Sequence, residues 1–154
     1  MSDVRNNKQP NIVIVMADQL SAPAVGAYGN QVVKTPHMDS LAQTGVVFEN
    51  AYCTSPLCAP SRFSMMSGQL PSRIGAYDNA SEFPARIPTF AHYLRDLGYQ
   101  TCLSGKMHFV GPDQLHGFEE RLTTDIYPAD FGWTPDWEAQ NQRVDWWCHN
   151  LASV

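Results

Sequence analysis

The sequence predicts an α/β fold with a mixed, largely parallel sheet and helices on both of its faces. Residues 11–16 form a continuous apolar run rich in β-branched residues, which is typical of a central strand buried on both faces. Helix patterns over residues 35–45 and 88–97 alternate with strand patterns over residues 46–48 and 99–104. Because parallel strands need long crossover connections, usually helical, this alternation favours a parallel sheet.

Length and composition describe a globular chain. The 154 residues are 44% hydrophobic and 16% charged, which is enough for one domain with a buried core. A formal net charge of −5 and scattered basic residues argue against a nucleic-acid partner. Residues 1–10 form a polar leader without the apolar stretch of a secretory signal, and no apolar run approaches the length of a membrane span. We therefore expect a cytoplasmic protein without a membrane partner.

Two helices have clear start and stop signals. In the first, Thr35 is placed to cap the helix, Pro36 to open its first turn and Gly45 to end it. The second runs from Pro88 to Leu97 and ends at Gly98. Each helix has one apolar face. In the first helix this face is made of Met38, Leu41 and Ala42. In the second helix it is expected to pack in the core and is made of Phe90, Tyr93, Leu94 and Leu97.

A third helix is predicted around the segment Cys58-Ala59-Pro60-Ser61-Arg62. Its proline suits a first helical turn, and Gly68 can close the helix. Cys58 would then lie just before the helix N-terminus, where free N–H groups favour an anion, and Arg62 would follow about one turn later. From these residues alone, a structural cysteine beside a solvated arginine is an alternative, and so is a Cys53–Cys58 disulfide.

Polar side chains follow the predicted strands. Asp18 comes directly after the first strand, and Lys106 and His108 come after the last one. In open α/β sheets ligands bind beyond the carboxyl ends of the strands, so we expect these residues and Cys58 to meet at one edge. Taken singly, Asp18 could be a turn residue and the Lys-x-His pair an exposed loop.

These motifs together resemble the sulfatase family, which has an alkaline-phosphatase-like fold. The segment from Cys58 to Arg62 resembles its C-x-P-S-R signature, and Gly105-Lys106-Met107-His108 resembles its G-K-x-H element. Asp18-Gln19 stands where many members have an acidic pair, so Gln19 offers a neutral amide oxygen in place of a second carboxylate. The resemblance implies that residues 11–154 are the amino-terminal part of a sulfatase catalytic domain, incomplete in this chain.

The resemblance also implies a chemistry. In the family, a formylglycine-generating enzyme oxidises the motif cysteine to formylglycine, and the hydrated aldehyde attacks sulfur. Carried over, Cys58 is the modified residue and, with Asp18, a ligand of a divalent cation, Ca²⁺ by resemblance. Arg62 would brace the modified residue or the cation shell, Lys106 would bind the sulfate oxygens and His108 would handle a proton.

Four stretches resemble the choline sulfatases within this family, which implies choline O-sulfate as the substrate. A trimethylammonium group is recognised by an aromatic face, here Trp133, while Asn79 and His149 would line the pocket. A homo-oligomer is expected by the same resemblance, and this chain alone is expected to be an inactive fragment. The alternatives are another sulfatase, a phosphonate or phosphate monoester hydrolase, and a non-catalytic, truncated sulfatase-fold protein. The four stretches are residues 55–63, 67–79, 104–117 and 125–133.

Overall fold

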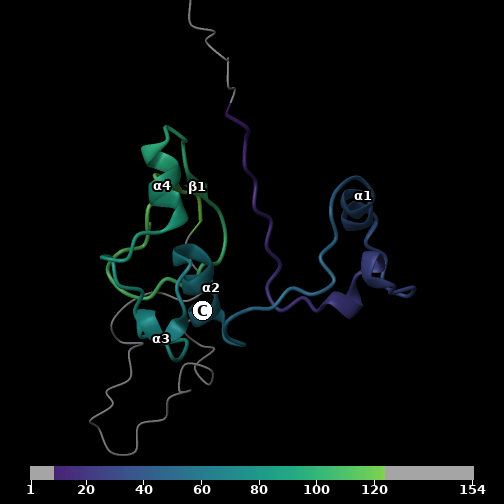
Figure 1. Ribbon diagram of the computed structural model, residues 1–154, viewed down its shortest axis with the longest axis horizontal. Coiled ribbons are helices and arrows are strands. Elements are labelled where there is room, and N and C mark those ends of the chain that lie inside the picture. Colours follow the sequence, from purple (N-terminus) through teal and green to yellow (C-terminus); the bar gives the residue numbers. More distant parts are fainter. Residues whose placement is uncertain (1–8, 124–154) are drawn as a thin grey trace, which may run out of the picture. The chain divides into compact units, whose positions relative to one another are not determined.

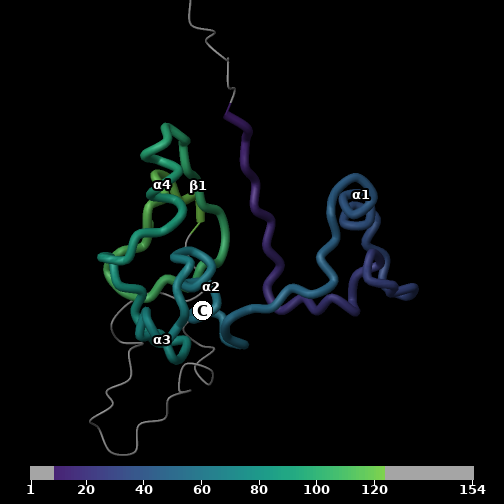
Figure 2. The backbone as a smooth tube through the Cα atoms, viewed as in Figure 1, coloured from purple at the N-terminus to yellow at the C-terminus, as the bar shows by residue number. Residues whose placement is uncertain are grey.

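The computed structural model describes residues 9–123 of the chain. The chain divides into two compact units, Met1–Ala51 and Tyr52–Val154. Figure 1 shows their helices and strands, and Figure 2 shows the course of the backbone. Among residues 9–123, no helix has the length and apolar character that crossing a membrane requires.

The described part of the first unit holds three short helices. Two 3-10 helices, η1 (Ala22–Ala24) and η2 (Gly26–Tyr28), precede the α-helix α1 (Pro36–Thr44). The predicted helix over residues 35–45 is therefore confirmed, with its cap and stop residues where the sequence indicated. Its apolar face is largely exposed, with Met38 at 42% and Leu41 at 73%.

A hydrogen-bonded chain ties η2 to α1. The Thr35 hydroxyl accepts a hydrogen bond from the Gly26 N–H at 2.8 Å and donates one to the Asp39 carboxylate at 3.0 Å. The carboxylate lies so close that a Cβ on Gly26 would come within 2.6 Å of it. Thr35 therefore joins two helices rather than capping α1 with its own side chain.

The strands predicted over residues 11–16 and 46–48 are wrong for the described structure. Within residues 9–123 the sheet consists of two later strands, and neither predicted segment belongs to it. Val15 is 92% exposed and Val46 79% exposed. A strand is stabilised by paired neighbours and a covered face, and these segments have neither within residues 9–51.

The second unit contains the remaining helices and both strands. Its helices are α2 (Cys58–Ser67), α3 (Pro71–Ile74) and α4 (Phe90–Asp96). Strands β1 (Cys102–Leu103) and β2 (Glu120–Arg121) pair in parallel, Cys102 opposite Glu120. The strand predicted over residues 99–104 is confirmed in its place but is shorter. Polar β2 has no apolar pattern that would predict it.

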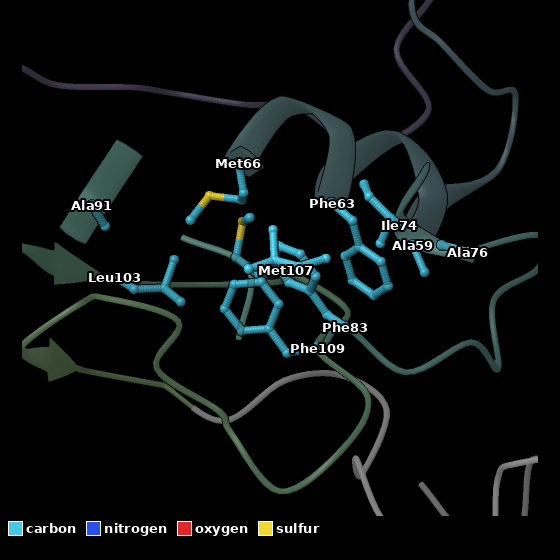
Figure 3. Close-up of a cluster of buried hydrophobic side chains, with 11 residues drawn as sticks. Ala59, Phe63, Met66, Ile74, Ala76, Phe83, Ala91, Leu103, Met107 and Phe109 are labelled. Carbon is cyan, nitrogen blue, oxygen red and sulfur yellow. The ribbon is translucent and has the colours of Figure 1, made fainter. Parts of the chain in front are cut away.

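Helix α2 and an aromatic cluster form the core of this unit. Figure 3 shows α2 side chains, Phe63 among them, pointing into a cluster with Phe83 and Phe109. The Phe63 and Phe83 rings stack with centroids 4.5 Å apart. Gly68 ends α2 with φ 69, a left-handed conformation that glycine adopts without strain. The core therefore fixes the helix whose first residue is Cys58.

The helix predicted over residues 88–97 is confirmed as α4, but it begins two residues later, at Phe90, and presents a different face. Thr89 is its N-cap, and Gly98 follows it with φ 85. Ala91 is fully buried and Phe90 packs against the core cluster. The predicted apolar face is wrong for Tyr93 and Leu97, which are 59% and 64% exposed.

Candidate active site

Cys58 is the first residue of α2, and the first turn of that helix is held from outside. The N-cap residue Leu57 has no side-chain acceptor for the free N–H groups. Instead, the Oδ1 atom of Asn79 accepts a hydrogen bond from the Ala59 N–H at 3.0 Å. Asn79, predicted to line a substrate pocket, therefore lies beside the residue that follows Cys58.

Lys106 lies next to the Cys58 thiol. Its Nζ atom donates to Cys58 Sγ across 3.5 Å, and both side chains are half-buried. The aldehyde oxygen of formylglycine is bonded to Cβ, so it would take the place of this sulfur if Cys58 were oxidised. Lys106 comes from the segment after β1, so the sequence prediction that Cys58 and Lys106 meet is confirmed. A cation at this point can hold an anionic group against the side chain of residue 58.

Arg62 is buried, with 7% of its surface exposed. Its Nη1 atom donates to the Lys106 carbonyl oxygen at 2.7 Å and approaches Met107 Sδ at 3.9 Å. The alternative of a solvated arginine is therefore wrong. A buried guanidinium needs partners, and this one ties α2 to the segment that carries Lys106. A direct contact of Arg62 with a modified Cys58 stays a prediction.

His108 lies in the same segment, is 4% exposed and has a positive φ of 59. Gln19, beside Asp18, has a similar φ of 58. Left-handed backbone is uncommon outside glycine and is enriched at functional sites, where the surrounding structure holds it. Both segments that the sequence singled out thus contain a strained residue, and no sequence signal predicted it.

The structure therefore brings four of the predicted residues together: Cys58, Arg62, Lys106 and Asn79. Asp18 belongs to the first unit, and its role as a metal ligand stays a prediction. The predicted substrate residues Trp133 and His149 lie outside the described residues.

The described residues do not complete a cation site. Within residues 9–123, no three His, Cys, Asp or Glu side chains lie close enough to hold a metal ion. The Asp18 carboxylate is the hard oxygen donor that Ca²⁺ prefers, so it fits as one ligand of a larger set. The described cysteines Cys53, Cys58 and Cys102 are free thiols, so the Cys53–Cys58 disulfide alternative is wrong.

Sequence reasoning missed a small network beside Asn79. The Asp78 carboxylate accepts hydrogen bonds from the Ala80 N–H at 3.0 Å and the Ser81 hydroxyl at 2.8 Å. Ser81 Oγ in turn accepts from the N–H groups of Tyr77 and Asp78. The Asp-x-x-Ser spacing was the available signal, because such side chains commonly fold back onto nearby backbone.

His116 is a second residue that the sequence did not single out. Its ring is fully buried between Phe83 and Phe109, with centroids 4.3 Å and 4.5 Å away. Burial lowers the pKa of His116 from 6.5 to about 4, although the Asp113 carboxylate 3.4 Å away opposes this. Burial alone would raise the pKa of Asp113, but hydrogen bonds from the N–H groups of His116 and Leu115 hold it below 3.8.

Comparison with known proteins points to one family. The family model described as Sulfatase matches residues 10–150. The choline-sulfatase of Rhizobium meliloti (strain 1021) is 60% identical over 146 residues, which are 95% of this chain and 28% of that protein. An N-acetylglucosamine-6-O-sulfatase of Bacteroides thetaiotaomicron is 38% identical over 131 residues, covering 80% of this chain and 23% of that protein. The chain thus spans about a quarter of the length of these curated relatives.

Solved structures show the same fold. A protein solved in complex with its substrate D-glucosamine-2-N,6-O-disulfate matches with a TM-score of 0.70 and 37% identity, over 74% of this chain and 23% of that one. The phosphonate monoester hydrolase of Agrobacterium radiobacter matches with a TM-score of 0.67 and 26% identity, over 81% of this chain and 27% of that one. The predicted fold class is confirmed. The described residues 9–123 hold part of that fold, with a two-stranded sheet.

Proposed function

The chain belongs to the sulfatase family, and on that premise we propose that it carries the nucleophile region of a sulfuric ester hydrolase. Members of the family generally use a formylglycine and a divalent cation. Cys58 is the residue to be converted, because in this chain it alone begins the C-x-P-S-R pattern. The observation that carries the proposal is the 3.5 Å contact between Lys106 Nζ and Cys58 Sγ at the start of α2.

The side chains around residue 58 have distinct roles in this proposal. Formylglycine supplies a hydrated aldehyde, an oxygen nucleophile that no standard side chain provides. Lys106 binds a sulfate oxygen and offsets the negative charge that grows as the S–O bond breaks. Arg62 holds the Lys106 backbone in place through its 2.7 Å hydrogen bond. His108 accepts and returns a proton during turnover.

Choline O-sulfate is the proposed substrate, supported by the 60% identity to a choline-sulfatase. Trp133 would present the aromatic face for the trimethylammonium group, with Asn79 and His149 lining the same pocket. The likeness to a phosphonate monoester hydrolase makes phosphonate monoesters the second substrate class to test. A homo-oligomer and a formylglycine-generating enzyme as the maturation partner belong to the same proposal.

A divalent cation, Ca²⁺ by resemblance, would polarise a sulfate oxygen when bound. Asp18 would supply one of its oxygen ligands, and the modified side chain of Cys58 another. Asp18→Asn keeps the shape of the side chain but removes its charge. Isothermal titration with Ca²⁺ should therefore show weaker binding in Asp18→Asn than in the unsubstituted protein, and equal binding would remove Asp18 from the ligand set.

A chimera tests the activity. In it, this chain replaces the matching 28% of the Rhizobium meliloti choline-sulfatase, and the protein is produced with a formylglycine-generating enzyme. Mass spectrometry should find the aldehyde at position 58, and the chimera should release sulfate from choline O-sulfate. Cys58→Ala should abolish both results. Cys53→Ala is the matched control, because it removes an exposed thiol five residues away and should keep both.

The substrates separate the alternatives. Faster turnover of an aryl sulfate or a phosphonate monoester than of choline O-sulfate would favour the other hydrolase classes. An unmodified Cys58 in a folded chimera, with no hydrolysis of any of these esters, would favour a non-catalytic protein.

A further inference from the structure

We propose that Asn79 is a positioning residue for Cys58 and that Asp78 and Ser81 hold it in that role. The inference rests on the proposed function of Cys58 as the modified nucleophile. It adds a task to Asn79 beyond lining a substrate pocket, and it gives Asp78 and Ser81 a part in the site.

The first turn of α2 lacks a local cap. Ser61 N–H is bonded to the Leu57 carbonyl at 3.1 Å, and Pro60 has no N–H to satisfy. The Ala59 N–H has no helical partner, and Ala59 is fully buried, so bulk water cannot reach it. Asn79 Oδ1 fills this place at 3.0 Å, although it lies 20 residues further along the chain. The side chain therefore serves α2 as an N-cap delivered by tertiary structure.

The backbone on both sides of Asn79 is fixed by side chains. Asp78 Oδ1 accepts from the Ala80 N–H, and Ser81 Oγ accepts from the N–H groups of Tyr77 at 3.1 Å and Asp78 at 3.3 Å. Ala80 is 3% exposed and anchors the turn in the interior. The turn thus holds the Asn79 amide in one position, from which its Oδ1 atom can accept the hydrogen bond of the Ala59 N–H.

The cap acts on Cys58 through one peptide unit. Ala59 directly follows Cys58, so a bond to the Ala59 N–H fixes the direction in which the Cys58 side chain leaves the helix. That direction brings Sγ to Lys106 Nζ. Without the cap, the first turn can fray, and residue 58 would spend less time at the distance that the chemistry needs.

Amide hydrogen exchange in the full 154-residue chain tests the cap directly. Asn79→Ala should speed exchange of the Ala59 N–H by on the order of tenfold, the effect expected from losing an N-cap. Asn79→Asp keeps the acceptor oxygen and should restore slow exchange. Ser67→Ala is the matched control, because it removes a side-chain bond to the Phe63 carbonyl at the other end of α2 and should leave the Ala59 amide slow. Slow exchange in Asn79→Ala, or fast exchange in Asn79→Asp, would overturn the proposal.

Kinetics in the chimera test the consequence. Ser81→Ala loosens the turn but keeps the Asn79 side chain, so it should lower kcat several-fold and by a larger factor than it raises KM. Ser67→Ala should leave both values unchanged. An unchanged kcat, or a change in KM alone, would contradict positioning. If the unsubstituted chimera releases no sulfate, the proposed function fails, and the exchange experiment still decides whether Asn79 caps α2.

Discussion

His116 should make the stability of the chain fall as the pH is lowered from about 6.5 towards 4. Its pKa is about 4 in the fold and 6.5 in the absence of the fold, because burial between two phenylalanine rings disfavours the charged ring. Between pH 6.5 and 4, the His116 ring is protonated in the unfolded chain but stays neutral in the folded chain. The free energy of unfolding therefore decreases with falling pH, until the folded ring is protonated as well near pH 4.

The magnitude follows from the two pKa values. Each tenfold change in proton affinity corresponds to about 1.4 kcal/mol, so the full difference is about 3 kcal/mol and about 2 kcal/mol is lost by pH 5. The nearby Asp113 carboxylate does not remove this effect, because its own pKa lies below 3.8 and it stays ionised throughout this range.

Urea unfolding of the full chain at pH 7, 6 and 5 measures the effect. His116→Phe keeps an aromatic ring in the same place but cannot titrate, so its free energy of unfolding should fall by about 2 kcal/mol less between pH 7 and 5. An NMR titration of the His116 ring protons gives the pKa itself. A pH dependence that is the same in both proteins, or a ring that titrates near pH 6.5, would refute the reasoning.

Two further substitutions test packing and the site. Gly117→Ala should lower the free energy of unfolding by about 2 kcal/mol, because Gly117 has φ 96 and a Cβ there would lie 2.7 Å from the backbone N of His92. Gly98 has φ 85 and open space around it, so Gly98→Ala should lower the free energy of unfolding by less in the same urea assay. Arg62→Met should destabilise the chain by about 2 kcal/mol, since it leaves the half-buried Lys106 carbonyl without its charged donor. An unfolding midpoint equal to that of the unsubstituted chain would contradict this account.

Local signals in the sequence determined the helices. Pro36 and Gly45 bound α1, Thr89 begins α4, and Gly68 ends α2. Each of these residues acts on the backbone within one turn of its own position, so its effect does not depend on the rest of the fold. The C-x-P-S-R and G-K-x-H motifs identified the family for a similar reason, because each consists of neighbouring residues and can be recognised without knowledge of the tertiary structure.

Only the tertiary structure decided which groups meet. The cap on Ala59 comes from Asn79, buried Arg62 donates to the Lys106 carbonyl, and His116 stacks on Phe83. Each contact joins residues 20 to 44 positions apart or rings from separate loops. Such contacts depend on how chain segments close on one another, which no local pattern records. The same reason explains why the strand predicted over apolar residues 11–16 is absent from the described structure. The apolar pattern indicates a preference for strand, whereas a strand forms only where a neighbouring strand pairs with it.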